Sequence, residues 1–264
     1  KPLVYAYSTK FPFMDVSPIC KRSVTDTIER LRSNGHKVIQ YEFPENFEKL
    51  AYYFYKIMSA DGWEFYFEKL KKEPVEKNLR PLLNYAALPN WIKSIASWIS
   101  GLLLKDCRAI EIIKSISKKD VYSLHKIQIE IDEISRNFRE SIDILGIDIL
   151  IMPVHVLPAT PIGSFSDIHF CAAHTFMWNL LNQPIGTLSI SSFDLSKDIV
   201  KDVWPRKFIF SDIFSNNLLD LAAQNFYNPE NAIGLPSGIQ LIGKANEDEK
   251  VIEAMIVIEK LFKK

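Results

Sequence analysis

Apolar residues recur along this chain at two spacings, which predict strands and helices in alternation. Near the amino end, β-branched and aromatic residues at 3–7 predict a strand. Ser17 and Pro18 form a typical helix start, apolar residues follow at helical spacing, and Gly35 stands where that helix should end. Residues 37–43 alternate and predict a second strand. This strand–helix–strand order favours a parallel pair in an α/β sheet.

The middle of the chain is predicted to be almost wholly helical, and the strand pattern returns after it. The helical region covers residues 45–145 and closes with a long amphipathic helix at 121–144, which Gly146 ends. Further strands are expected at 148–152, 185–190 and 238–242, and further helices at 169–181 and 246–262. The pattern as a whole predicts an α/β domain with a helical insertion.

Composition excludes several kinds of protein. The 264 residues are 47% hydrophobic and 24% charged with zero formal net charge. The chain therefore has enough apolar residues for a sizeable core, and no nucleic-acid partner is expected. Three widely separated cysteines argue against a disulfide framework and fit a reducing compartment. No Cys/His cluster has zinc spacing, and neither a P-loop nor a dinucleotide motif is present. We expect no metal and no cofactor.

Three stretches carry a family resemblance. They are DILIMP at 148–153, HTFMWNLLNQPIGTLSI at 174–190 and GLPSGIQLIGKANEDEKVIEAM at 234–255. In this order and spacing they resemble the C-terminal part of the amidase-signature family, and the opening at 17–42 resembles the strand–helix–strand that follows that family's catalytic core. The resemblance implies that residues 1–264 form the C-terminal part of one amidase-signature domain, whose mixed central sheet is covered by helices.

Most features of these stretches have an architectural explanation. Gly238 would allow close backbone approach, and Gln240 lies two residues further along the same strand face. Asn179 needs polar partners if its helix buries it. The acidic run at 247–249 opens the last helix, where it complements the helix dipole. We assign none of these residues a catalytic role.

Residues 88–105 (LPNWIKSIASWISGLLLK) form an apolar, tryptophan-containing helical pattern. The stretch is short for a membrane span and contains Pro89, Lys93 and four serines, which favours a position in the membrane interface. A buried core helix is the alternative. The stretch resembles the hydrophobic cap with which fatty-acid amide hydrolases dock on membranes, and this resemblance favours a membrane cap within the 45–145 insertion. The implied membrane-binding residues are Trp91, Ile95, Trp98, Ile99, Leu102 and Leu103.

The same resemblance implies a channel for a lipid amide substrate. By position, its substrate-binding residues would be Met58, Leu88, Trp91, Ile110, Thr175, Phe176 and Met177, although each is also an ordinary core residue type. The lipid hydrolases often carry a Pro-Trp pair before the last helix, where this chain has Ala245 and Asn246. That departure puts one wall of the acyl pocket, and the preferred acyl chain, in doubt.

The residues that perform hydrolysis in this family have no counterpart in the chain. Amidase-signature enzymes use a serine nucleophile in a Gly/Ser-rich stretch, a bridging serine and a lysine base. Here no two glycines are adjacent, the pair Ser191-Ser192 resembles a strand end, the five histidines show no partner spacing, and Gly-x-Ser-x-Gly is absent. Because the chain begins with Lys1, we expect a fragment or processed product whose N-terminal catalytic half is missing.

Three functional hypotheses follow from the sequence. The first is part of a serine-type hydrolase of fatty-acid amides, intracellular and peripheral or monotopic on endomembranes. The second is a non-catalytic lipid- or membrane-binding protein, and the third is a soluble, cytoplasmic amidase or amidotransferase A-type subunit. Expected partners are a lipid amide, a membrane surface and the catalytic half, with a homodimer left open. A partial sheet should also leave an unpaired strand edge and a bare apolar face.

Overall fold

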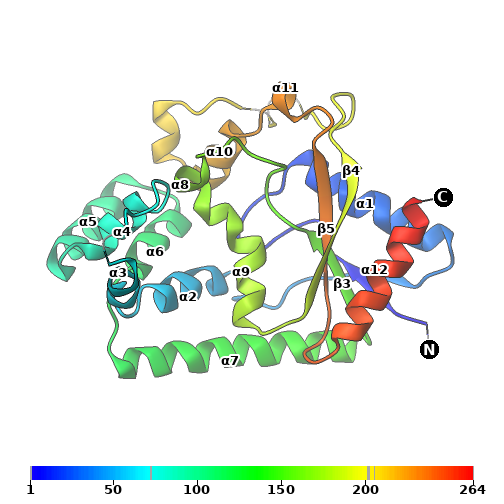
Figure 1. The fold of residues 1–264 in the computed structure, drawn as a ribbon, viewed down its shortest axis with the longest axis horizontal. Coiled ribbons are helices and arrows are strands. Elements are labelled where there is room, and N and C mark those ends of the chain that lie inside the picture. Colours follow the sequence, from blue (N-terminus) through cyan, green and yellow to red (C-terminus); the bar gives the residue numbers. More distant parts are fainter. Residues whose placement is uncertain (1, 72, 201–202, 205, 264) are drawn as a thin grey trace.

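A five-stranded mixed sheet lies at the centre of the computed structural model, which describes residues 2–71, 73–200, 203–204 and 206–263 (Figure 1). The strands are β1 (Tyr5–Tyr7), β2 (Val38–Gln40), β3 (Ile149–Pro153), β4 (Ile185–Ser192) and β5 (Pro236–Ile242). Their order across the sheet is β2-β1-β3-β5-β4. β1 is parallel to β2 and β3, whereas β5 is antiparallel to β3 and β4. The predicted parallel pair and mixed sheet are both confirmed.

Helices α2 to α7 lie between residues 45 and 145, as predicted, whereas α8, α10 and α11 lie where no helix was predicted. The bounds of the helices are α1 (Pro18–Ser33), α2 (Lys49–Met58), α3 (Glu64–Leu70), α4 (Arg80–Ala87), α5 (Asn90–Leu103), α6 (Cys107–Ser115), α7 (Val121–Ile144), α8 (Phe165–Ile168), α9 (Ala173–Leu180), α10 (Leu218–Asn225), α11 (Pro229–Ala232) and α12 (Asp248–Phe262). The helix expected at 169–181 is divided into a 3₁₀ turn, His169–Ala172, followed by α9.

β2 is shorter than the predicted strand because the chain leaves the sheet to bury aromatic rings. Tyr41 makes one more backbone bond, from its N–H to the carbonyl oxygen of Tyr7 at 2.9 Å. Its ring is then buried edge-on against Phe43 and Phe138. Edge-to-face aromatic packing of this kind adds to the area that the rings bury. Tyr41 and the half-buried Phe43 therefore join the core between sheet and helices instead of extending β2.

Both faces of the sheet centre are covered, which corrects the expected bare apolar face. On one face, Ile149, Ile151 and Leu241 pack under α1 and α12. On the other, Leu150 and Met152 belong to a larger core with residues of α2, α7 and α9. Side chains alternate between the faces of a strand, so the continuous apolar run of β3 supplies both cores.

Gly238 and Gln240 of β5 each lie against backbone carbonyl groups of neighbouring elements. A methyl group added at Gly238 would collide with the carbonyl oxygen of Leu188 on β4, so the predicted close approach is confirmed. The Gln240 Nε2 donates to the carbonyl oxygens of Pro153 and His174, each at 2.9 Å. This single amide connects β5 to β3 and to α9. Asn179 is exposed and needs no buried partner.

One edge of the sheet is long and open. Among the described residues, β4 pairs only with β5, so its other side presents unpaired backbone groups. The opposite edge, β2, has three residues, whereas β4 has eight. A long unpaired edge is a template for pairing with another segment. The expected strand edge is therefore present, at β4.

Candidate functional site

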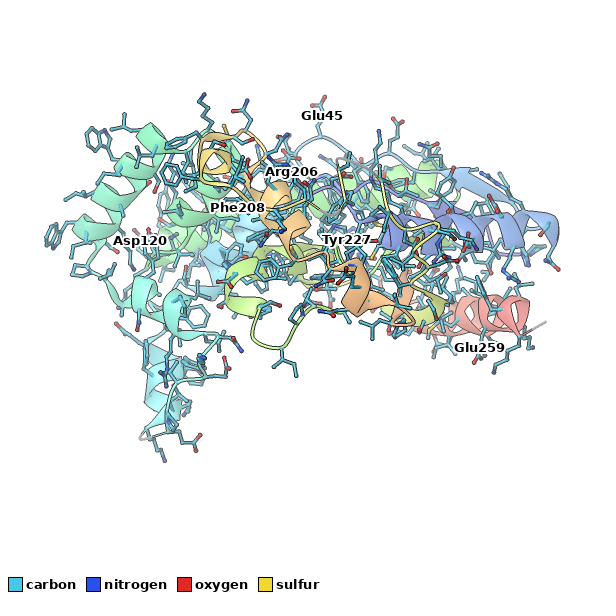
Figure 2. All side chains as sticks on the ribbon, turned by 90° about the horizontal axis from the view of Figure 1, so that it is seen from above. Glu45, Asp120, Arg206, Phe208, Tyr227 and Glu259 are labelled. Carbon is cyan, nitrogen blue, oxygen red and sulfur yellow. The ribbon has the colours of Figure 1, made fainter. Side chains whose placement is uncertain are left out.

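The most unusual surface of the molecule is the outer face of α5, at the end opposite α12 (Figures 1 and 2). Pro89 precedes the helix, which runs from Asn90 to Leu103. The side chains at Trp91, Trp98 and Leu102 are 66%, 67% and 66% exposed. We name the apolar face of α5 by its six members, all exposed: Trp91, Ile95, Trp98, Ile99, Leu102 and Leu103.

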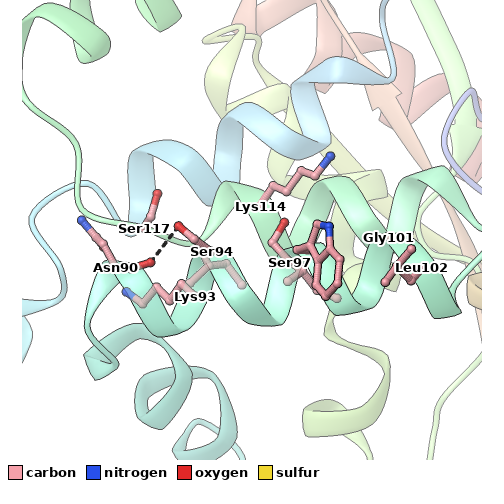
Figure 3. Close-up of a pocket in the computed structure, with 11 residues that line it drawn as sticks. Asn90, Lys93, Ser94, Ser97, Gly101, Leu102, Lys114 and Ser117 are labelled. Carbon is pink, nitrogen blue, oxygen red and sulfur yellow. Dashed lines mark hydrogen bonds between the residues drawn. The ribbon is translucent and has the colours of Figure 1, made fainter.

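The orientation of α5 is the reverse of that of an ordinary surface helix. A helix of a soluble domain turns its apolar stripe toward the core. In α5 the only buried residue is Lys93. The helix lies against α6, and a groove of about 710 Å³ is open between the two (Figure 3). The Lys93 Nζ donates to the carbonyl oxygen of Ala86 at 2.5 Å. In the described chain, α5 therefore does not behave as a core helix.

The length of α5 fits a position along a surface better than a path across a bilayer. Its 14 residues span about 21 Å at 1.5 Å per residue, below the roughly 30 Å of a hydrocarbon core. None of the helices in the described ranges is long and apolar enough to cross a membrane.

The seven residues predicted to bind substrate come from five places in the fold. Met58 ends α2, Leu88 follows α4, and both are exposed, as is Trp91 on α5. Ile110 on α6 and Thr175 on α9 are half-buried. Helix α2 packs on both α6 and α9.

The two remaining predicted residues are packed tightly within the core. The ring of Phe176 stacks on Phe54 with centroids 3.8 Å apart and planes 10° apart. Met177 is completely buried in the larger core. These two side chains fill space beneath α2, and the assignment of all seven residues to a channel stays a prediction.

A separate apolar cavity of about 230 Å³ lies between α4, α6 and the turn around α8. Tyr85, Ile112, Ile116, Phe165 and His169 contribute to its walls, and none of the seven predicted residues does. Burial lowers the pKa of His169, so its imidazole is neutral. It joins the polar groups of Asn78, Ser166 and Tyr85 in a largely apolar space. No sequence motif marked this cavity, because its walls come from three separate helical segments.

A small polar cluster at the start of β5 lacks the properties of a catalytic site. The Ser23 hydroxyl donates to the Ser237 hydroxyl at 3.1 Å, and Ser237 contacts the Cys20 thiol at 3.7 Å. Burial raises the pKa of Cys20 to about 11, so the thiol is protonated and a poor nucleophile. His155 lines the adjacent cavity, but its Nδ1 is engaged by the backbone of Leu157.

Within the part of the chain that the structure describes, no three His, Cys, Asp or Glu side chains gather as they would around a metal ion.

Comparison with known proteins places the chain in a family. The family model "Amidase" matches residues 1–252. Fatty acid amide hydrolase 1 of Caenorhabditis elegans is 21% identical over 244 residues, which cover 92% of this chain and 40% of that protein. A putative amidase of Schizosaccharomyces pombe is 26% identical over 141 residues, 53% of this chain and 24% of that protein.

The fold of the chain matches solved members of the same group. A fatty acid amide hydrolase structure aligns with a TM-score of 0.72 and 21% identity, covering 98% of this chain and 40% of that one. The likeness at this identity concerns the fold. The chain spans about 40% of the length of these hydrolases.

Proposed function

The chain belongs to the amidase family, and on that premise we propose that it forms part of a serine-type hydrolase that cleaves fatty-acid amides at a membrane surface. Similarity to fatty acid amide hydrolases over nearly the whole chain supports the reaction class and the substrate class. The single observation that carries the membrane part is the exposed apolar face of α5. This function implies an intracellular protein that is peripheral or monotopic on membranes.

We place the catalytic serines and lysine outside these 264 residues. No Gly/Ser-rich stretch is present to supply a nucleophile and oxyanion donors, and the buried Cys20 cannot replace it. The open edge of β4 offers a pairing site for a strand of the catalytic segment. The partner in this proposal is therefore a polypeptide that completes the sheet.

An assay of long-chain fatty-acid amide hydrolysis tests the proposed reaction. We expect no turnover by the 264-residue chain alone, and turnover by a longer product that begins upstream of Lys1 and includes a lysine and a Gly-Gly-Ser-Ser-like stretch. Sequencing the transcript upstream of Lys1 shows whether such a product exists. Turnover by the chain alone, or an inactive longer product, would contradict the proposal.

The apolar face of α5 is the proposed contact with the membrane. Tryptophans suit the headgroup depth and the aliphatic side chains suit the region beneath it. We expect the chain to float with phosphatidylcholine vesicles and the double variant Trp91→Ser, Trp98→Ser to lose most of this binding. The matched control Ile252→Ser, Ile256→Ser changes two exposed apolar residues of α12 and should float like the wild type. Equal flotation of the tryptophan variant and the wild type would reject the membrane contact.

A second candidate, a non-catalytic lipid- or membrane-binding protein, is favoured by the same exposed face together with the lack of a catalytic pattern. Flotation without turnover, in a gene that lacks the upstream catalytic stretch, would support it. The third hypothesis, a soluble amidase or amidotransferase subunit with α5 as a core helix, fits less well because six apolar side chains of α5 are exposed.

A further inference from the structure

A serine and a lysine are in direct contact in the turn between α6 and α7. The Lys119 Nζ is hydrogen-bonded to the Ser117 hydroxyl. The same nitrogen contacts the carbonyl oxygens of Ser115 at 3.1 Å and of Ser117 at 2.7 Å. The backbone N–H of Lys119 donates to the Ala60 carbonyl oxygen at 2.8 Å. The backbone N–H of Ser117 donates to the Ser59 hydroxyl at 3.2 Å. The turn that presents the pair is therefore fixed to the end of α2.

The surroundings of Lys119 favour its neutral form. The side chain is half-buried, and no carboxylate pairs with it in the ion pairs of the described residues. Burial, followed by repulsion from Lys56 on α2 and Lys93 on α5, lowers the pKa of Lys119 to about 8. Its neighbour Lys118 differs, because it pairs with Glu64 at 2.6 Å. Near neutral pH, an appreciable fraction of Lys119 is therefore available as a base.

The hydrogen bonds around the Lys119 Nζ suit a proton transfer from Ser117. A neutral amine has two N–H donors and one lone pair. The two carbonyl oxygens accept from the donors, which leaves the lone pair to the Ser117 hydroxyl. After the transfer the ammonium has three donors, and the same three oxygen atoms accept them. No partner has to move, and a lysine beside a serine is a known arrangement for activating the hydroxyl.

Ser117 lines the groove between α5 and α6, whose walls suit an acyl chain (Figure 3). Trp98 and Leu102 of α5 and Ile116 after α6 supply apolar surface there, and burial of an acyl chain against such surface is favourable. Among the described residues, the backbone N–H of Lys118 donates to no backbone group. The N–H of the residue that follows a nucleophilic serine is a common donor to the oxyanion. The groove therefore offers a nucleophile, a base, an oxyanion donor and apolar walls.

We propose that Lys119 activates Ser117 as a nucleophile, which accepts the acyl group of an activated ester bound in the groove. Lys119 takes the Ser117 proton while the bond from Oγ to the carbonyl carbon forms. The bond from that carbon to the leaving oxygen then breaks, and Lys119 returns the proton to the leaving group. The products are an acyl-serine and a free alcohol or phenol. An amine leaves far less readily than a phenol, so this step is separate from the amide hydrolysis proposed above.

Acylation by p-nitrophenyl octanoate tests the site in the complete protein. Peptide mass spectrometry after an acid quench locates the acyl group, because an upstream serine of the proposed hydrolase would react as well. We expect octanoyl on the peptide that contains Ser117 and none on that peptide in Ser117→Ala. An unmodified peptide, or octanoyl on Lys119 in place of Ser117, would overturn the proposal. Acylation of the upstream serine reports only on the proposed hydrolase.

Lys119→Arg separates a base from a helix cap. Arginine keeps donors for the two carbonyl oxygens but stays protonated and cannot accept the proton. Acylation of Ser117 should therefore fall about 100-fold or more, with thermal unfolding like that of the wild type. Ser94→Ala is the matched control, since the Ser94 hydroxyl lines the same groove but donates to the Asn90 carbonyl oxygen at 2.9 Å. It should leave the rate unchanged. Equal rates in Lys119→Arg and the wild type would overturn the proposal.

The pH dependence of Ser117 acylation identifies the base independently of any effect of the arginine on folding. The rate should rise about tenfold per pH unit below pH 8 and level off above it, because only neutral Lys119 takes the proton. The charged groups around Lys119 are Lys93 and Lys56, and Lys56 lies 3.4 Å from Glu111. Lys93→Gln removes one repelling charge and should move the midpoint to higher pH. A wild-type rate that still rises at pH 10, as expected of an ordinary lysine, would contradict the proposal.

Discussion

At the scale of single residues, the centre of the fold contains a histidine that burial keeps uncharged. His174 in α9 is completely buried, and its ring lies 3.9 Å from that of Phe11 at 34°. Burial, followed by the nearby His155, lowers the pKa of His174 to about 3. Its role is structural, since its backbone carbonyl accepts the hydrogen bond from Gln240.

This histidine should make the stability of the chain fall in acid. An unfolded histidine has a pKa of about 6.5. Below that pH the imidazole of His174 is protonated in the unfolded state but stays neutral in the folded state. The free energy of unfolding is then highest above pH 6.5 and falls toward pH 3, by up to about 1.4 kcal/mol per pH unit. His174→Leu should flatten this slope in urea unfolding at pH 7 and pH 5. The exposed His125→Leu should not, and an unchanged slope in His174→Leu would refute the assignment.

At the scale of elements, the contact between β4 and β5 depends on the absence of a side chain. Gly238 pairs with Ser189, and its α-carbon faces the Leu188 carbonyl at a distance that excludes a methyl group. Because the obstacle is backbone in a neighbouring strand, it cannot move aside without breaking the pairing. The glycine therefore fixes the spacing of the two strands that form the open side of the sheet.

Gly238→Ala should be strongly destabilising. We expect a loss of about 1–3 kcal/mol in the free energy of unfolding, the usual range when a packed site is overfilled. Gly101→Ala is the matched control, because an added methyl at this position of α5 meets nothing within 4 Å. It should raise stability by about 0.5–1 kcal/mol through helix propensity. Denaturant unfolding of both variants provides the measurement, and similar effects would contradict this explanation.

At the scale of the whole molecule, the unpaired edge of β4 makes the isolated chain prone to association. Eight residues of strand present open hydrogen-bonding groups on one side. A second apolar region, which includes Ile209 and Phe210, is also exposed on the segment between β4 and α10. Both surfaces suit the catalytic segment that we propose as partner.

Without that segment, we expect the 264-residue chain to form oligomers through β4. Thr187→Lys, Ser189→Lys places charge at exposed positions of this strand and should shift the chain toward monomer in sedimentation velocity, because charged edge strands resist pairing. Thr25→Lys, Ser33→Lys, exposed on α1, should leave association unchanged. A dilute wild-type monomer that melts in one cooperative transition would contradict this expectation.

The elements themselves were largely predictable because their signals are local. The bounds of α7, Val121–Ile144, agree with the prediction, since its apolar period runs unbroken between Asp120 and Gly146. Gly35 has a φ of 82°, as expected of a glycine that ends a helix. β2 was overpredicted because alternation at 41–43 arises from aromatic packing in the core and not from strand pairing.

The sequence by itself determined the order of strands and helices, the close approach at Gly238 and the family to which the chain belongs. Only the tertiary structure decided whether each apolar face is covered by another element or left exposed. The period of α5 is the same for a core helix and for an exposed one, because spacing along a chain shows that a helix has an apolar side but not what lies against it. The cavity beside His169 was unpredictable for the same reason, since its walls come from helical segments that only folding brings together.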